Sequence, residues 1–261
     1  NKDFSCLKGF CPSFVTVHGP KMRKAEGAAG AADPLDGVPE PQPFPLNGGW
    51  SAIIDGVGGT GVVTVGAVLG MAAHLEGKGC GMIDMAGLAQ KGGSVFTHVR
   101  IAQTPDDIHA IRVSAGKADL ILGCDLVVSG AKKVISAVRQ DHTIFVANTA
   151  EIMPGEFARS PDFSLPVERL KKAIREAAGA ERSHFFDATR TASALFGNSL
   201  GANMFMLGFA WQRGFVPLTE ASILEAIRLN GEAVAMNTEA FRWGRRAAAD
   251  AKGFEAFVAP L

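Results

Sequence analysis

The chain has 261 residues, and its 26 Lys and Arg balance 26 Asp and Glu, so the formal net charge is zero. This balance argues against a protein that coats nucleic acid, because such proteins carry a surplus of basic residues. Hydrophobic residues make up 47% of the chain, enough for a sizeable core, yet no apolar run approaches the roughly 20 residues that span a bilayer.

The first 49 residues differ in composition from the rest. Residues 1–23 form an arm rich in Phe and Cys, which we interpret as the end of a preceding domain. The start at Asn1, with no secretory signal, favours a fragment of a longer polypeptide. Residues 24–49 are rich first in Ala and Gly and then in Pro, so we expect an extended linker or a strap lying on a neighbour. Residues 50–261 are expected to form the globular domain.

In that domain, short apolar runs alternate with helical patterns, which is typical of an α/β sheet. We expect strands at 51–55, 79–84, 94–102, 119–123, 142–148 and 183–187. Helices are expected at 60–76, 126–139, 166–178, 200–213, 219–230 and 233–249. The residues of 94–102 alternate as in a half-exposed strand. The pattern predicts a three-layer, Rossmann-like α/β domain with a parallel-rich sheet and a helical C-terminal part.

The sharpest motif is a run of glycines between the first strand and the first helix. Gly56, Gly58, Gly59 and Gly61 permit a tight turn and leave bare backbone beside the open N–H groups of the helix, which favour an anion. The spacing matches the dinucleotide fingerprint, and Asp84 ends the second strand, where a ribose-binding acid lies in such folds. Tight packing of helix on sheet requires the same glycines, so both interpretations stay open.

A second glycine-containing segment directly precedes the strand at 94–102. Gln90 and Lys91 stand beside Gly92 and Gly93, whose backbone allows turns that other residues cannot make. One interpretation is a loop that offers an amide and a cation to an anionic ligand or a partner subunit. The other is an ordinary turn with solvated polar side chains.

The cysteines give a third candidate site. Cys6 and Cys11 have a spacing that suits iron–sulfur ligation, but two thiolates do not complete the usual four ligands. A pair of reduced thiols in a hydrophobic arm is the alternative. Cys80 and Cys124 lie in strand-like runs and are expected in the core. Four unevenly spaced cysteines do not form a disulfide scaffold, so a reducing cytoplasm is the expected location.

The C-terminal helices carry polar residues near their starts. Thr219 stands where an N-cap belongs, with Ser222 three residues later. Asn198 and Asn203 are best interpreted as capping residues, although Asn203, inside its helix, is also placed to face a site.

Two segments together resemble a known family. Residues 55–100 contain DGVGGTGVVTVGAVLG and IDMAGLAQKGGSVFTHVR, and they resemble the γ-type domain of 2-oxoacid:ferredoxin oxidoreductases, which pairs a G-x-G-G-x-G turn with a Q-R/K-G-G-S-V loop. The arm NKDFSCLKGFCPSFVTVHG is similar to the segment after the thiamine-diphosphate domain in fused indolepyruvate ferredoxin oxidoreductases. NSLGANMFML at 198–207 is also similar to the family. Lys91 departs from the family pattern, where Arg is frequent, and Lys lacks the bidentate fork of Arg.

The resemblance implies a role within a larger enzyme. That enzyme uses thiamine diphosphate and [4Fe-4S] clusters to decarboxylate indolepyruvate or a similar aryl 2-oxoacid oxidatively, with coenzyme A as acyl acceptor and ferredoxin as electron acceptor. It implies that Cys6 and Cys11 ligate a cluster, and that the glycine turn and the Gln90–Gly93 loop face the ligand. It further implies an oligomer with the thiamine-binding domains, and no turnover by the fragment alone.

One alternative function competes with this interpretation. The G-x-G-x-x-G spacing and Asp84 are also compatible with an autonomous NAD(P)-binding Rossmann-fold protein.

Overall fold

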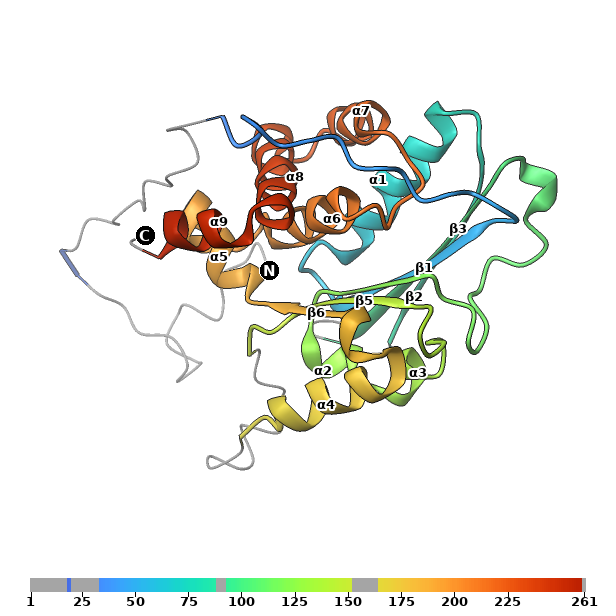
Figure 1. Cartoon of the computed structure of the whole chain (residues 1–261), viewed down its shortest axis with the longest axis horizontal. Helices are drawn as coiled ribbons and strands as arrows, with labels where there is room; N and C mark the ends of the chain where they lie inside the picture. The colour runs from blue at the N-terminus through green and yellow to red at the C-terminus, as the bar shows by residue number, and fades with distance from the viewer. Residues whose placement is uncertain (1–17, 20–32, 88–92, 152–163, 260–261) are drawn as a thin grey trace.

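The structure is a computed structural model, and it describes residues 18–19, 33–87, 93–151 and 164–259. A six-stranded sheet lies between two layers of helices (Figure 1). Its strands are β1 (Trp50–Val57), β2 (Gly79–Ala86), β3 (Ser94–Ala102), β4 (Leu120–Gly123), β5 (Ile144–Asn148) and β6 (Ser183–Phe186). The order across the sheet is β2-β3-β1-β4-β5-β6. β1, β4, β5 and β6 pair in parallel, whereas β3 runs antiparallel to both its neighbours. The predicted parallel-rich α/β sheet is confirmed.

The two helical layers differ in size. The larger one contains α1 (Val62–Leu75), α5 (Ala188–Phe196), α6 (Ala202–Gln212), α7 (Glu220–Asn230), α8 (Val234–Ala249) and α9 (Ala251–Val258). On the other face lie α2 (Leu126–Ser129), α3 (Lys132–Ile135) and α4 (Val167–Ala178). Figure 1 shows α1, α6, α7 and α8 above the sheet and α2, α3 and α4 below it. Each layer buries its own cluster of apolar side chains against one face of the sheet.

The expected helix at 126–139 is wrong as a single element, because the chain breaks at Gly130 into α2 and α3. A methyl group at Gly130 would lie 2.5 Å from Cδ2 of Leu170, so the break lets α4 pack against the backbone. The helices α5 and α9 lie in the part of the chain that was expected to be helical, but no bounds were predicted for them. Each begins at an aspartate that accepts a hydrogen bond from a backbone N–H: Asp187 from Arg190 and Asp250 from Gly253.

The expectation of a half-exposed strand at β3 is also wrong. Val99 and Ile101 are buried on the α1 side, and Phe96 is buried on the other side. His98 is buried as well, and its Nδ1 accepts a hydrogen bond from the backbone N–H of Val113. The alternation of the sequence is real, but helices or loops cover both faces of this strand.

The Pro-rich segment lies on the chain's own C-terminal helices (Figure 1). Gln212 of α6 donates a hydrogen bond from Nε2 to the carbonyl of Pro39 over 2.6 Å, and Arg242 of α8 forms an ion pair with Asp33. Described residues 33–49 therefore form a strap over the domain that follows them.

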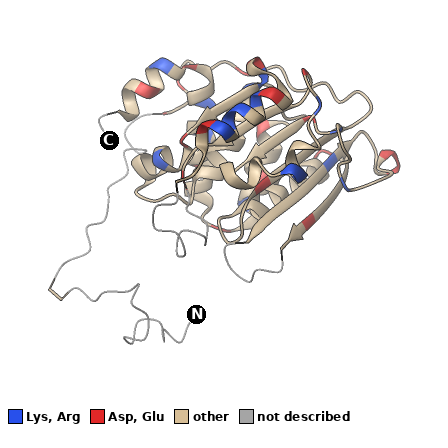
Figure 2. Cartoon of the chain, turned by 90° about the horizontal axis from the view of Figure 1, so that it is seen from below, with Lys and Arg blue, Asp and Glu red and all other residues tan. Residues whose placement is uncertain are grey.

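Charged side chains of both signs share the surface helices (Figure 2). On α4, Lys171 pairs with Glu168 and Lys172 pairs with Glu176. Among the described residues, no helix is both long and apolar enough to cross a membrane.

Candidate functional site

The glycine turn connects the carboxyl end of β1 to α1. Gly59 and Gly61 have φ values of 88° and 91°, a region that side chains with a Cβ rarely adopt. Gly61 is the N-cap of α1, and no side chain caps the helix there. The first N–H groups of α1 thus have no helical acceptor and present the positive end of the helix dipole. Gly59 is exposed, and a methyl group on it would meet nothing within 4 Å. This part of the turn is open to a ligand.

Packing accounts for Gly56. A methyl group there would lie 2.7 Å from Cγ2 of Val62, the first residue of α1, and 3.1 Å from Cβ of Cys124. The four glycines of the motif therefore serve two purposes. Gly56 lets helix and sheet meet closely, while Gly59, which is exposed, and Gly61, which is half-buried, form the left-handed turn.

Two distant segments hold this turn in place. The N–H of Gly58 donates to the carbonyl of Gly93 over 2.8 Å. On the other side, Nδ2 of Asn203, near the start of α6, donates to the carbonyl of Thr60 over 2.8 Å. The glycine turn, the end of the second glycine loop and the NSLGAN segment thus meet at one edge of the sheet. Asn203 does face the turn, as one of the two interpretations expected.

The second glycine loop closes the β2–β3 hairpin. The N–H of Gly87 donates to the carbonyl of Ser94, which brings the two ends of the loop together. Gly93 lies beside the glycine turn, while Gln90, Lys91 and Gly92 lie outside the described residues.

A buried polar cluster at the carboxyl ends of β1 and β4 was missed by the sequence reasoning. Asp55 is fully buried, and its Oδ1 accepts a hydrogen bond from the Ser129 hydroxyl over 2.7 Å. Burial raises the pKa of Asp55 well above its usual value; the Ser129 hydroxyl lowers it by less, and Asp125 raises it further. Asp125 caps α2 by accepting from the N–H of Val128. The signal that could have found Asp55 is an acid at the end of an apolar strand.

The side-chain amide of Asn148, on β5, lies next to this cluster. Nδ2 of Asn148 donates to the hydroxyl of Thr189, and its Oδ1 accepts from the N–H of Ala188 over 3.0 Å. The side chain thereby fixes the start of α5 to the sheet. Cys124, buried as expected, stands close by, and burial raises the pKa of its thiol well above the usual value. An inert, protonated thiol follows from this environment.

The alternative interpretation of Asp84 as a ribose-binding acid does not agree with the sheet order. In the dinucleotide fold that acid ends a strand adjacent and parallel to the first. Here β3 lies between β1 and β2, and Oδ1 of Asp84 accepts a hydrogen bond from the hydroxyl of Thr97 on β3 over 2.6 Å. The side chain is thus held by the neighbouring strand.

The candidate metal ligands Cys6 and Cys11 lie outside the described residues. Within the part of the chain that the structure describes, no group of three or more His, Cys, Asp or Glu side chains is placed to hold a metal ion.

The fold is thus an α/β domain with a glycine turn after β1 and an antiparallel strand, β3, between β1 and β2. Residues 51–247 match the family described as pyruvate ferredoxin/flavodoxin oxidoreductase, and the chain belongs to this family. The resemblance stated from the sequence is confirmed.

Curated relatives agree with this assignment. The indolepyruvate oxidoreductase subunit IorB of Methanothermobacter thermautotrophicus is 30% identical over 203 residues, which cover 77% of this chain and 98% of the relative. The protein of the same name from Thermococcus kodakarensis is 30% identical over 206 residues, covering 78% of this chain and 98% of that protein.

Solved structures share the fold at lower identity. Pyruvate oxidoreductase subunit PORC from Thermotoga maritima has a TM-score of 0.52 at 19% identity and covers 76% of this chain and 95% of its own. The γ subunit of a keto/oxoacid ferredoxin oxidoreductase from Geobacter sulfurreducens has a TM-score of 0.53 at 17% identity, covering 76% and 98%. A 2-oxoglutarate:ferredoxin oxidoreductase from Magnetococcus marinus, with 2-oxoglutarate, coenzyme A and succinyl-CoA bound, has a TM-score of 0.54 at 18% identity and covers 77% of this chain and 31% of its own.

Proposed function

We propose that this chain is the γ-type portion of a thiamine-diphosphate-dependent oxidoreductase that transfers electrons from indolepyruvate, or another aryl 2-oxoacid, to ferredoxin. The observation that carries the proposal is the 30% identity to a protein named indolepyruvate oxidoreductase subunit IorB, over 98% of that protein's length. In the proposed organisation, residues 1–23 end a preceding domain of a fused chain, 24–49 link it, and 50–261 form the γ-type domain.

The proposed reaction converts the 2-oxoacid and coenzyme A into CO2 and an acyl-CoA, while two electrons pass through iron–sulfur clusters to ferredoxin and one proton is released. Thiamine diphosphate, when bound, supplies the nucleophilic carbon for decarboxylation. The chain matches a single subunit of such an enzyme, IorB, over 98% of that subunit's length. We therefore assign the thiamine site to other domains of the enzyme.

The contribution of this chain is the wall of the coenzyme A site. Coenzyme A carries phosphates, and the open N–H groups at the start of α1 favour an anion. The exposed turn at Gly59 leaves room for a ligand against bare backbone. Gly93 lies directly beside it, so the Gln90–Gly93 loop is in reach of the same ligand.

Partner subunits fit the surface of α1 and β2. α1 is apolar on nearly all sides, and its outward residues Val63 and Met71 are 44% and 40% exposed, next to Met82 of β2 at 37%. A helix of this kind is normally buried within a larger assembly. We infer that the thiamine-binding domains or another copy of the chain cover it, that Cys6 and Cys11 ligate a [4Fe-4S] cluster with cysteines from those domains, and that the enzyme acts in the cytoplasm.

The first experiment measures turnover. The chain alone is mixed with indolepyruvate, coenzyme A and a viologen dye, and again after addition of the thiamine-binding chains. We expect dye reduction only in the complete mixture, since the reactive centre is housed in the added chains. Reduction by the chain alone contradicts the assignment.

The second experiment follows hydrogen exchange of the backbone with and without coenzyme A in the complete enzyme. We expect slower exchange at residues 59–63 and 90–93, with no change at the α7–α8 connection. Titration calorimetry with NAD and NADP tests the rival function: micromolar binding favours the dinucleotide-binding protein, and no binding favours the oxidoreductase module.

A further inference from the structure

A cavity of about 690 Å³ opens between the outer strand of the sheet and four helices. β6 and α5 form one side, and α6, α8 and α9 the other. Its walls include five phenylalanines, and four of them, Phe186, Phe205, Phe209 and Phe254, pack against one another. No residue of the glycine turn lines it. The volume lies within the roughly 300–1,000 Å³ that is typical of small-molecule sites.

The four rings form a continuous aromatic wall. Phe186 lies 4.8 Å from Phe209 and 5.8 Å from Phe205, measured between ring centroids, and Phe205 lies 5.6 Å from Phe254. Phe205 is anchored in the core, whereas Phe186 and Phe209 are only partly buried. Phe205 and Phe254 are buried, so a flat aromatic ligand gains by covering the exposed surface of Phe186 and Phe209, through stacking or edge-to-face contact.

The charged groups at the cavity indicate which charge a bound ligand would carry. Arg190, in the first turn of α5, is exposed and lines the cavity, and the start of that helix adds its own positive dipole end. The Asp187 carboxylate is occupied as the cap of α5, where it accepts the N–H of Arg190 over 2.8 Å. Glu255 lines the cavity from α9, so a second anionic group on the ligand is disfavoured there.

We propose that this cavity is a binding site for a small aryl monocarboxylate, whose ring packs against Phe186 and Phe209 and whose carboxylate pairs with Arg190. The guanidinium fork of Arg matches a carboxylate with two parallel hydrogen bonds. The site stands on the cavity alone and does not depend on the oxidoreductase assignment.

Titration calorimetry on the full chain tests the proposal with two probes, indole-3-acetate and its neutral analogue 3-methylindole. We expect saturable binding of indole-3-acetate at least tenfold tighter than that of 3-methylindole, which corresponds to about 1.4 kcal/mol. Arg190→Gln is expected to remove this preference and leave 3-methylindole binding within about twofold. Arg228→Gln, which changes an exposed arginine on α7, is the matched control and should preserve the preference.

A second variant blocks the cavity. Ala251 lines it at an exposed position, so Ala251→Trp is expected to weaken both probes at least tenfold while the circular dichroism spectrum stays unchanged. Three results overturn the proposal: no saturable binding of indole-3-acetate, an unchanged preference in Arg190→Gln, or unchanged binding in a folded Ala251→Trp protein.

Discussion

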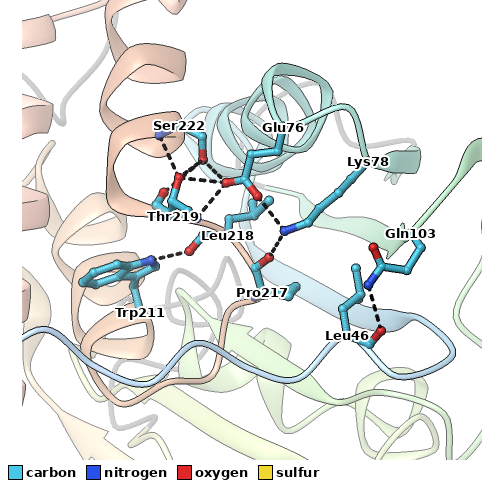
Figure 3. A network of polar contacts seen from close by, with 9 residues as sticks. All are labelled: Leu46, Glu76, Lys78, Gln103, Trp211, Pro217, Leu218, Thr219 and Ser222. Carbon is cyan, nitrogen blue, oxygen red and sulfur yellow. Dashed lines mark hydrogen bonds and ion pairs between the residues drawn. The ribbon is translucent and has the colours of Figure 1, made fainter.

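The carboxylate of Glu76, which follows the last residue of α1, accepts hydrogen bonds from both the backbone N–H and the hydroxyl of Thr219, the N-cap of α7 (Figure 3). The two distances to Oε1 are 2.7 and 2.9 Å, and the hydroxyl of Ser222 donates to the same oxygen over 2.5 Å. Lys78 donates to Oε2 and also to the carbonyl of Pro217 over 2.6 Å. One carboxylate therefore joins the end of α1 to the start of α7.

This arrangement predicts acid-sensitive stability. Burial by itself raises the pKa of Glu76, but hydrogen bonds from Lys78, Ser222 and Thr219 outweigh it and hold the pKa below the usual value. The contribution is therefore full above the pKa of the unfolded chain, near pH 4.5, and is lost as the pH falls through the lower folded pKa. Glu76→Gln should lower the free energy of unfolding at pH 7 by about 1 kcal/mol, because the site is partly solvated.

Urea unfolding at pH 7 and at pH 3 measures this effect. The difference between wild type and Glu76→Gln should shrink at the lower pH. Glu232→Gln, at an exposed glutamate before α8, is the control and should leave both curves unchanged. An equal loss at both pH values would show that the ionised form of Glu76 is not what stabilises the contact.

Substituting a glycine at the crossing of α6 and α8 is predicted to cause a large loss of stability. A methyl group at Gly208 would lie 1.9 Å from the carbonyl oxygen of Phe241, and one at Gly244 would lie 2.0 Å from that of Phe205. Each helix thus rests on bare backbone of the other. Gly208→Ala forces the helices apart and should lower the free energy of unfolding by about 3 kcal/mol, as measured by urea unfolding.

A glycine-to-alanine substitution on α1 provides a control, because it is expected to raise the free energy of unfolding. A methyl group at Gly70 would lie 3.7 Å from Sγ of Cys80, an ordinary contact. Gly70→Ala should stabilise the protein by about 0.5–1 kcal/mol, since alanine favours a helix interior and restricts the unfolded chain. A destabilised Gly70→Ala protein would mean that α1 and β2 are packed more tightly than the structure shows.

The contact between Asn203 and Thr60 predicts the mobility of the glycine turn. Asn203→Asp replaces the donor Nδ2 with an oxygen that repels the Thr60 carbonyl. We expect hydrogen exchange at residues 59–63 to become about tenfold faster, with little change in the sheet, because an opening cost of roughly 1.4 kcal/mol is removed. Asn198→Asp changes an exposed asparagine of the same segment and should leave exchange at the turn unaltered. If both variants changed hydrogen exchange at residues 59–63 equally, the hydrogen bond from Asn203 to Thr60 would not be what holds the turn.

The buried Asp55 predicts that its contribution to stability changes with pH in the opposite direction to that of Glu76. Its pKa in the folded protein lies well above that of the unfolded chain, chiefly because of burial. The stability that the protonated form provides is therefore present at low pH and lost as the pH rises toward the folded pKa. Asp55→Asn keeps the shape of the neutral acid, so it should match wild type near pH 4 and exceed it in thermal stability at pH 8. Asp36→Asn, at an exposed aspartate, should show no such crossover.

The contacts of Arg245 predict that this side chain holds the strap, residues 33–49, on the C-terminal helices. The side chain is only 1% exposed; it donates to Gln212, pairs with Glu220 and Glu40, and lies 4.6 Å over the ring of Trp211. Arg245→Met leaves Glu220 without its buried partner, so we expect a loss of about 3 kcal/mol and faster proteolysis within residues 33–49.

Glu40, the exposed ion-pair partner of Arg245, provides a control variant for this prediction. Glu40 is 72% exposed, so Glu40→Gln should change stability and proteolysis far less than Arg245→Met. Equal proteolysis of Arg245→Met and wild type would show that other contacts retain the strap.

Local patterns in the sequence predicted much of the molecule. The glycine run after an apolar strand predicted the turn at Gly59 and Gly61, because φ values near 90° are accessible to glycine and strained for other residues. The cap at Thr219 was predicted for a similar reason, since its hydroxyl reaches the N–H of Ser222 within one turn of helix. The order of strands and helices followed from their apolar periodicities.

The tertiary structure alone decided which distant segments meet. The position of β3 between β1 and β2 placed Asp84 beside Thr97, whereas a ribose-binding role was one of the interpretations that the sequence left open. The hydrogen bond from Asn203 to the carbonyl of Thr60 joins residues 143 positions apart, so no periodicity could indicate it. Asp55 became a buried acid only when α2 covered the end of β1. Local backbone preferences are set within a few residues, whereas burial and pairing depend on how the whole chain packs.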